Sequence, residues 1–170
     1  MPWYGAHSYL NEYISKHHCK RIMEIGVYTG ENAASMVETA IEETDDSREV
    51  EYYGFDLFAN ASSDRVGRRL ERLGCTVALF EGNTLDTLPG AVGSLPKMDL
   101  IFIDAGKSFA EATSDWQNAE RLVHDGSGVY VHNADFPGVH KMLNQVSRET
   151  YRVEMFWVPS EGRVALITKK

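Results

Sequence analysis

Cysteine is scarce in this chain, and its scarcity excludes two classes of protein. Among the 170 residues only Cys19 and Cys75 are cysteines, which are too few to staple a fold by disulfides or to ligate zinc tetrahedrally. A reducing compartment, and hence a cytoplasmic location, is therefore expected. Long apolar runs are missing too, since no stretch approaches the roughly 18 residues of a membrane span, and nothing resembles a signal peptide. We expect no membrane partner.

Basic residues are outnumbered by acidic ones. Lys and Arg total 17 against 25 Asp and Glu, which gives a net charge of -8. A protein whose affinity depends on phosphate backbones has the opposite balance, so no nucleic-acid partner is expected. The remaining composition, with 43% hydrophobic and 25% charged residues, is that of an ordinary globular protein. The length suits one core, and we predict a single domain over residues 1–170.

Short segments rich in β-branched and aromatic residues alternate with longer helical segments. Met98–Asp104 is almost wholly apolar, which is typical of a strand inside a parallel sheet covered on both faces. This alternation predicts a doubly wound α/β fold with a mostly parallel, seven-stranded sheet. The tail differs, because two strands joined across Pro159–Gly162 indicate a hairpin that adds antiparallel strands at the sheet edge. The predicted strands are 21–27, 50–57, 75–81, 98–104, one beginning with 129–131, 151–158 and 163–168, and the predicted helices are 31–43, 64–73, 109–123 (stopped by 126–128) and 139–148.

Two glycines follow the first predicted strand. Gly26 and Gly30 lie in a turn from strand to helix, where a ligand can approach the backbone with no Cβ in the way. Their spacing is not the G-x-G-x-x-G of dinucleotide-binding folds, which argues against a nicotinamide oxidoreductase. Asp56 ends the second predicted strand, where a carboxylate can accept both hydroxyls of a ribose. Each feature alone is equally consistent with a tight turn or a solvated carboxylate, but together they favour a nucleoside ligand without a pyrophosphate.

With these motifs the chain resembles the class I S-adenosylmethionine-dependent methyltransferases, from about Tyr9 to Thr168. The resemblance implies an enzyme that moves a methyl group from S-adenosylmethionine to an acceptor. In that family the loop after the first strand holds the methionine end of the cofactor, which Glu24 would orient. Asp56 would bind the ribose, and a segment after the third strand would line the adenine pocket. The implied cofactor-binding residues are Glu24, Gly26, Tyr28, Gly30, Asp56, Leu57, Gly82, Asn83, Thr84 and Asp104.

Polar residues also follow the fourth and fifth predicted strands. Here the chain is similar to the metal-dependent O-methyltransferases of the catechol and caffeoyl-CoA type, which have D-x-x-K and D-N at these places and, in the catechol branch, a Pro-Gly shortly beyond. The resemblance implies Asp104, His132 and Asn133 as ligands of a divalent metal. It makes Asp104, Lys107 and His132 the catalytic residues, with Lys107 as the base, and implies a small-molecule acceptor methylated on a hydroxyl oxygen. His132 replaces the family's second acid, which disfavours magnesium and favours manganese, iron or another ion that tolerates imidazole.

Other functions stay open at this stage. A related group of small methyltransferases carries D-G-G-H-S-Y where this chain has DAGKSF over 104–109, and it fits equally well. One alternative is therefore a metal-free N- or O-methyltransferase that uses His132 or Lys107 as its base. Another is a non-catalytic nucleoside-binding protein of the same fold.

The first 20 residues form a candidate lid or dimer segment. Trp3, Tyr4, His7 and Tyr9 either cover the acceptor pocket or are plain packing. Nearly every other residue belongs to the cofactor domain, so a second subunit is a natural source of the missing wall, and a homodimer is a possible assembly. The Phe156-Trp157 pair suits a sheet edge or a subunit contact.

Overall fold

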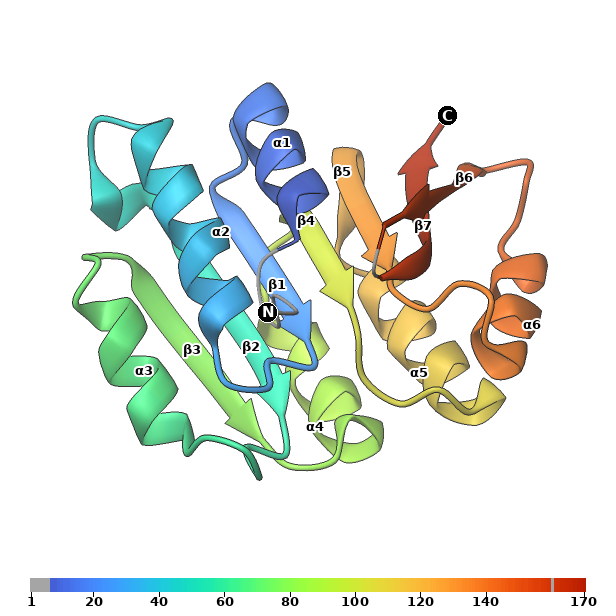
Figure 1. Cartoon of the computed structure of the whole chain (residues 1–170), viewed down its shortest axis with the longest axis horizontal. Helices are drawn as coiled ribbons and strands as arrows, with labels where there is room; N and C mark the ends of the chain where they lie inside the picture. The colour runs from blue at the N-terminus through green and yellow to red at the C-terminus, as the bar shows by residue number, and fades with distance from the viewer. Residues whose placement is uncertain (1–6, 160) are drawn as a thin grey trace.

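A single mixed sheet organises the molecule (Figure 1). The computed structural model describes residues 7–159 and 161–170. Its strands lie in the order β3-β2-β1-β4-β5-β7-β6, which confirms the predicted doubly wound α/β architecture with seven strands. The elements are α1 (Ser8–His17), β1 (Arg21–Ile25), α2 (Glu31–Glu42), the 3-10 turn η1 (Ser47–Glu49), β2 (Glu51–Asp56), α3 (Ser63–Glu71), β3 (Thr76–Glu81), α4 (Thr84–Ala91), the 3-10 turn η2 (Val92–Ser94), β4 (Met98–Ile103), α5 (Phe109–Glu120), β5 (Val123–Val131), α6 (Pro137–Gln145), β6 (Tyr151–Val158) and β7 (Gly162–Lys169).

Helices cover both faces of the sheet, and each face has its own apolar core. Residues of α1, α2 and α3 pack on one face in a cluster that includes Leu10 and Met36, and residues of α4, α5 and α6 pack on the other in a cluster that includes Trp116 and Met142. Strand β4 lies between them: Leu100 and the other strand residues after Asp99 are 4% exposed or less. The near-continuous apolar sequence of this strand is thereby explained.

The C-terminal hairpin is present, and its second strand is inserted into the sheet. β7 pairs antiparallel with β5 on one side and with β6 on the other. Because β5 and β6 both pair antiparallel with β7, they run parallel to each other, and β7 is the one strand among the described residues that runs against the others. The edge strand on this side of the sheet is therefore β6, which pairs with β7 alone, and β3 is the edge strand on the other side.

The fifth strand begins earlier than predicted, so the helical prediction through Val123 is wrong at its end. α5 stops at Glu120, and β5 starts at Val123 and includes Gly126–Gly128, which the sequence favours as a helix stop. The register shifts between Met98 and Leu100, and the Ser127 hydroxyl stabilises the bulge by donating to the Met98 carbonyl at 2.6 Å. A Cβ on Gly128 would lie 2.5 Å from the Tyr13 ring, so this glycine makes room for α1.

Two helices have no counterpart in the prediction. α1 is amphipathic and buries Tyr9, Leu10, Tyr13 and Ile14, while α4 begins at Thr84 in a segment predicted only to line the adenine pocket. Asn83 caps α4 by accepting from the Leu85 N–H at 3.0 Å. Among the described residues no helix is long and apolar enough to cross a membrane.

Candidate functional site

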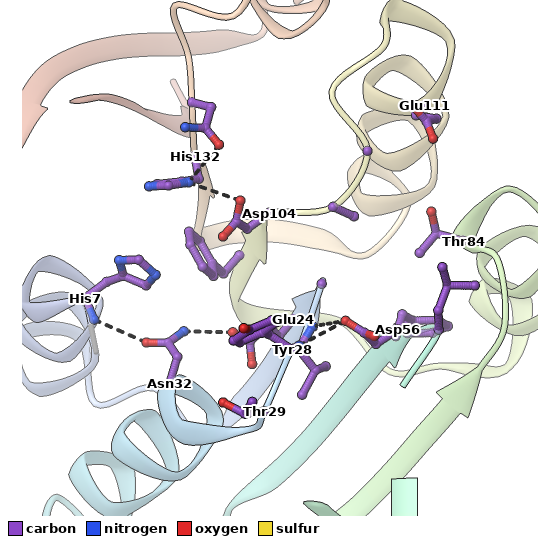
Figure 2. A pocket seen from close by; sticks show the side chains of 18 of the residues that line it. His7, Glu24, Tyr28, Thr29, Asn32, Asp56, Thr84, Asp104, Glu111 and His132 are labelled. Carbon is purple, nitrogen blue, oxygen red and sulfur yellow. Dashed lines mark hydrogen bonds and ion pairs between the residues drawn. The ribbon is translucent and has the colours of Figure 1, made fainter. Parts of the chain in front are cut away.

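A cavity of about 830 Å³ opens at the carboxyl ends of β1, β2, β4 and β5, where open α/β sheets bind their ligands. Its size is that of a small-molecule site. Figure 2 shows the side chains that point into it from the strand ends, from α2 and from the segment before α1. The lining residues predicted from the sequence are Glu24, Gly26, Tyr28, Asp56, Leu57, Gly82, Asn83, Thr84, Asp104, His132 and Asn133.

The turn after β1 brings two strand ends unusually close together. Gly26 has φ of 96°, and a Cβ there would lie 2.2 Å from the Asp104 carbonyl oxygen, so only glycine fits. Tyr28, two residues on, also has a positive φ, 57°, and its side chain is 54% exposed. Gly30, the residue just before α2, does not line the cavity; its backbone packs against Val66 of α3.

Asp56 supports this turn as well as facing the cavity. Its Oδ2 accepts from the backbone N–H groups of Val27 and Tyr28 at 2.7 and 3.0 Å, and its Oδ1 accepts from Phe58 N–H at 2.7 Å. A carboxylate offers about four acceptor positions, so three are already in use. The carboxylate can take one ribose hydroxyl without giving up a backbone bond, rather than the two expected from the sequence.

Glu24 lies at the base of the cavity and is almost wholly buried. Its oxygens accept hydrogen bonds from the Tyr52 hydroxyl at 2.5 Å and from Asn32 Nδ2 at 2.8 Å, both neutral donors. Burial raises the pKa of Glu24 to about 8, although these hydrogen bonds oppose the shift. Asn32 in turn accepts from the His7 backbone N–H at 3.3 Å, which connects the cavity floor to the segment before α1 (Figure 2).

Asp104, Lys107, His132 and Asn133 meet at the ends of β4 and β5. Asp104 Oδ1 accepts from Lys107 Nζ at 2.6 Å and lies 3.0 Å from His132 Nδ1. Burial alone would raise the pKa of Asp104, but the hydrogen bond from His132 and the Lys107 charge lower it below its usual range. Asp104 is therefore an anion at neutral pH. Lys107 does not line the cavity, because its ammonium group turns towards Asp104.

The tautomer of His132 follows from its neighbours. Nδ1 is 3.0 Å from two acceptor oxygens, Asp104 Oδ1 and Asn133 Oδ1, so this nitrogen carries the proton. Nε2 then has a free lone pair. This atom is buried and has no hydrogen-bond partner among the described residues.

The three expected metal ligands thus lie together, but they do not fit a magnesium site. The nitrogen that His132 turns towards the other two residues is Nδ1, which carries a proton and so has no lone pair for a metal. Asp104 Oδ1 already faces the Lys107 ammonium group. Magnesium prefers an octahedron of oxygens with carboxylate charge, whereas this trio offers one carboxylate that is already paired.

Two further residues line the cavity on the side of His132. The His7 ring lies before α1 and packs on Phe102 and His132, with centroids 4.9 and 5.3 Å apart, so this residue both lines the cavity and packs against its wall, and the choice between lid and plain packing stays open. Trp3 and Tyr4 lie outside the described residues. Sequence reasoning missed Glu161, which accepts from His7 Nδ1 at 2.6 Å; a Glu in the turn Pro159–Gly162 reads only as a solvated charge.

Comparisons with known proteins identify the family and the fold. A family model described as a methyltransferase domain matches residues 23–134, more than half of the chain, while no curated protein sequence matches. Similar solved structures include the O-methyltransferase TomG of Streptomyces achromogenes, involved in tomaymycin synthesis and solved in complex with S-adenosylmethionine (TM-score 0.74, 17% identity, 95% of this chain and 78% of that one). An O-methyltransferase of Bacillus cereus in complex with S-adenosylhomocysteine has a TM-score of 0.71, 17% identity and coverage of 95% and 79%. CalS11, a TDP-rhamnose 3'-O-methyltransferase of calicheamicin biosynthesis, has a TM-score of 0.76, 16% identity and coverage of 95% and 76%. At these identities the likeness establishes the shared fold.

Proposed function

The chain belongs to the methyltransferase-domain family, and from that premise we propose that it transfers the methyl group of S-adenosylmethionine to the oxygen of a small hydroxylated molecule. The observation that carries the proposal is the cavity, which is lined by the carboxyl groups of Glu24, Asp56 and Asp104 and by the backbone of the turn at Gly26. Fold alone would not select this activity.

The charge of the cavity supports a cationic cofactor. S-adenosylmethionine carries a sulfonium and an ammonium group, and anionic groups in a partly desolvated site attract cations more strongly than in water. Glu24, which a pKa of about 8 keeps largely protonated in the free chain at neutral pH, has no basic partner among the described residues, so a ligand ammonium group would be its first and would favour its ionised form. We assign the methionine end to Glu24 and the turn after β1, the ribose to Asp56, and the adenine to Leu57 and Gly82–Thr84.

Methyl transfer from a sulfonium is an in-line displacement, for which positioning supplies most of the acceleration. We assign the acceptor to the part of the cavity beside Asp104 and His132. A hydroxyl there can give its proton to His132 Nε2, while Asp104 holds the ring through Nδ1. Lys107 neutralises the Asp104 charge and keeps that carboxylate in place. In the ion-free chain this arrangement supports His132 rather than Lys107 as the residue next to the acceptor.

Calorimetric titration with S-adenosylhomocysteine tests the cofactor assignment. Binding with one equivalent per chain is expected, and NAD should give no heat. Absence of S-adenosylhomocysteine binding would contradict the proposal, whereas binding without turnover across a panel of phenols, catechols and sugars would favour a non-catalytic nucleoside-binding protein.

Two further proposals concern the context of the enzyme. A homodimer is supported by the exposed Met155 and Trp157 side chains on the edge strand β6, 42% and 67% exposed, which a second subunit can cover.

A cytoplasmic location is supported by the two buried cysteines, which form no disulfide, because disulfides persist mainly in oxidising compartments.

A further inference from the structure

His7, His132 and Glu161 form a cluster of potential metal ligands on the acceptor side of the cavity. One ligand atom from each of the three lies within 4.8 Å of the other two. The three residues come from different parts of the chain: His7 precedes α1, His132 follows β5, and Glu161 lies in the turn between β6 and β7. This set shares only His132 with the trio implied by the resemblance, and it uses the opposite nitrogen of that ring.

From this cluster we infer a binding site for one divalent transition-metal ion, held by His7 Nδ1, His132 Nε2 and a Glu161 carboxylate oxygen. The donor set of two imidazoles and one carboxylate suits first-row ions such as Mn²⁺, Fe²⁺, Co²⁺ and Zn²⁺, and it does not suit Mg²⁺. The argument for metal binding rests on the positions of these three side chains and does not depend on the proposed function. Its catalytic consequence rests on the proposed function: a bound ion would occupy His132 Nε2 and would take the place of the imidazole as the group that lowers the pKa of the acceptor hydroxyl.

The hydrogen bonds of His132 support the assignment of Nε2. A metal-bound histidine almost always donates its other ring N–H to a carboxylate or carbonyl, which fixes the ring and raises the basicity of the ligand. His132 Nδ1 is 3.0 Å from Asp104 Oδ1 and from Asn133 Oδ1, while Nε2 is buried without a hydrogen-bond partner in the part of the chain that the structure describes. Asp104 and Asn133 are then outer partners of the metal site and not its ligands.

The distances are close to those of a bound ion. Two nitrogen or oxygen ligands of a tetrahedral ion, with bonds of about 2.0–2.2 Å, are about 3.3–3.6 Å apart. His132 Nε2 and Glu161 Oε2 are 3.6 Å apart. His7 Nδ1 and Glu161 Oε2 are 2.6 Å apart, so to admit an ion the two atoms must separate by about 1 Å and Nδ1 must give up the proton that it donates to Glu161, which leaves to solvent or to the other ring nitrogen.

The cluster is partly shielded from water, as a ligand set should be. The side chains of His7 and His132 are each 14% exposed and that of Glu161 is 21% exposed. The His7 ring is held by contacts with Phe102 and Tyr9, with centroids 4.9 and 5.5 Å away. The two rings are therefore largely in place, and the main change that binding requires is the opening of the His7–Glu161 hydrogen bond.

The site is tested by titrating Co²⁺ into the untagged full-length chain and following visible absorption and heat. We expect one equivalent to bind, Zn²⁺ to compete, and Mg²⁺ to leave the signal unchanged. Glu161→Gln and His7→Phe should each weaken Co²⁺ binding at least about tenfold. The matched control is His18→Ala, which removes the histidine of an exposed pair in which His18 Nδ1 and Glu43 lie 3.2 Å apart, and it should leave binding unchanged.

A second variant separates this site from the trio implied by the resemblance. Asn133 has φ of 52°, which glycine adopts freely, so Asn133→Gly removes the amide with little backbone strain. It should affect Co²⁺ binding much less than Glu161→Gln. Preference for Mg²⁺, a larger loss in Asn133→Gly, or unaltered binding in Glu161→Gln and His7→Phe would overturn the inference.

S-adenosylhomocysteine binding and thermal unfolding are measured on every variant. Folded variants that retain the nucleoside but lose Co²⁺ support the metal site. Wild-type chain that binds the nucleoside and no Co²⁺ refutes the metal site and leaves the proposed function intact, whereas the reverse result refutes the proposed function alone.

Discussion

The Glu24 carboxyl group has the most unusual surroundings of any acidic side chain in the cavity. It is buried, its donors are Tyr52 and Asn32, and its pKa is raised to about 8. Between its ordinary pKa of 4.5 and about 8, the folded chain keeps this proton while the unfolded chain loses it. Folding stability due to Glu24 is therefore full below pH 4.5 and is lost as the pH rises to about 8.

The Glu24→Gln variant should accordingly lose less stability than the wild type between pH 5 and pH 8.5. Glutamine stays neutral and still offers an acceptor to the Tyr52 hydroxyl. Urea unfolding at both pH values measures the difference, which we expect to exceed about 1 kcal/mol because each unit of pKa shift is worth 1.36 kcal/mol. Parallel pH dependences in the two proteins would mean that Glu24 is ionised in the folded state.

Asp104 and Asp99 allow a comparison of two carboxylates at opposite ends of β4. Asp104 faces the cavity, whereas Asp99, at the amino end of the strand, accepts from the backbone N–H groups of Lys20 and Arg21 at 2.8 and 2.9 Å. Asp104→Ala should lower turnover at least about a hundredfold with a small change in melting temperature. Asp99→Ala should cost about 1–3 kcal/mol of stability and leave turnover unchanged. Equal effects of the two substitutions on turnover and stability would reduce Asp104 to a structural role.

At the scale of single residues, the sequence predicted which residues lie at the cavity better than it predicted their hydrogen-bond partners. It placed Asp56 at a strand end beside the cavity, because strand ends are legible from apolar runs. It did not show that three backbone N–H groups occupy that carboxylate, since this depends on how the turn after β1 folds back. Glu161 was missed because its role arises only when the β6–β7 turn meets His7, a residue 154 positions away.

Helix α6 and the segment before α5 are packed backbone against backbone. A Cβ on Gly138 would lie 2.3 Å from the Lys107 carbonyl oxygen and 2.6 Å from the Phe109 nitrogen. The Pro137-Gly138 pair therefore starts a helix and also fixes the segment that carries Lys107. The sequence indicated this pair by resemblance, and the structure supplies its physical reason.

Gly138→Ala should displace that segment and cost about 1–3 kcal/mol, the range for overpacking, while also lowering turnover. S-adenosylhomocysteine affinity should change little, because the substitution lies on the acceptor side. Gly90 is the matched control: it lies within α4, and a Cβ added there would meet no atom within 4 Å, so Gly90→Ala should stabilise the fold by about 0.4–1 kcal/mol. Calorimetric unfolding and titration distinguish these outcomes, and a stable, fully active Gly138→Ala would refute the packing argument.

At the scale of elements, the sequence predicted the alternation of strands and helices and the hairpin, but not the start of β5. Glycines at 126 and 128 read as a helix stop because their Cβ-free backbone disfavours helices. Their actual reason is tertiary: Tyr13 of α1 occupies the space beside Gly128, and Ser127 bonds to Met98 across the sheet. Neither partner is near in sequence.

For the whole molecule, the predicted fold and family are confirmed, and the assembly is open to a direct test. Light scattering should give twice the chain mass of 19.1 kDa if β6 edges or N-terminal segments pair. Trp157→Ser, which removes the most exposed aromatic side chain of β6, should shift the mass towards the monomer. A wild-type mass of 19.1 kDa at working concentrations would exclude the homodimer.

The position of β7 has a consequence for synthesis on the ribosome. β7 is translated after β6 but lies between β5 and β6, so a nascent chain that has just completed β6 cannot yet join that strand to the sheet. Until β7 emerges, β5 presents an open edge next to apolar residues such as Val129 and Val131, the kind of surface that invites pairing with another chain. Closure of the sheet and protection from aggregation therefore coincide in one late step, and slow translation after codon 158 would prolong the hazard.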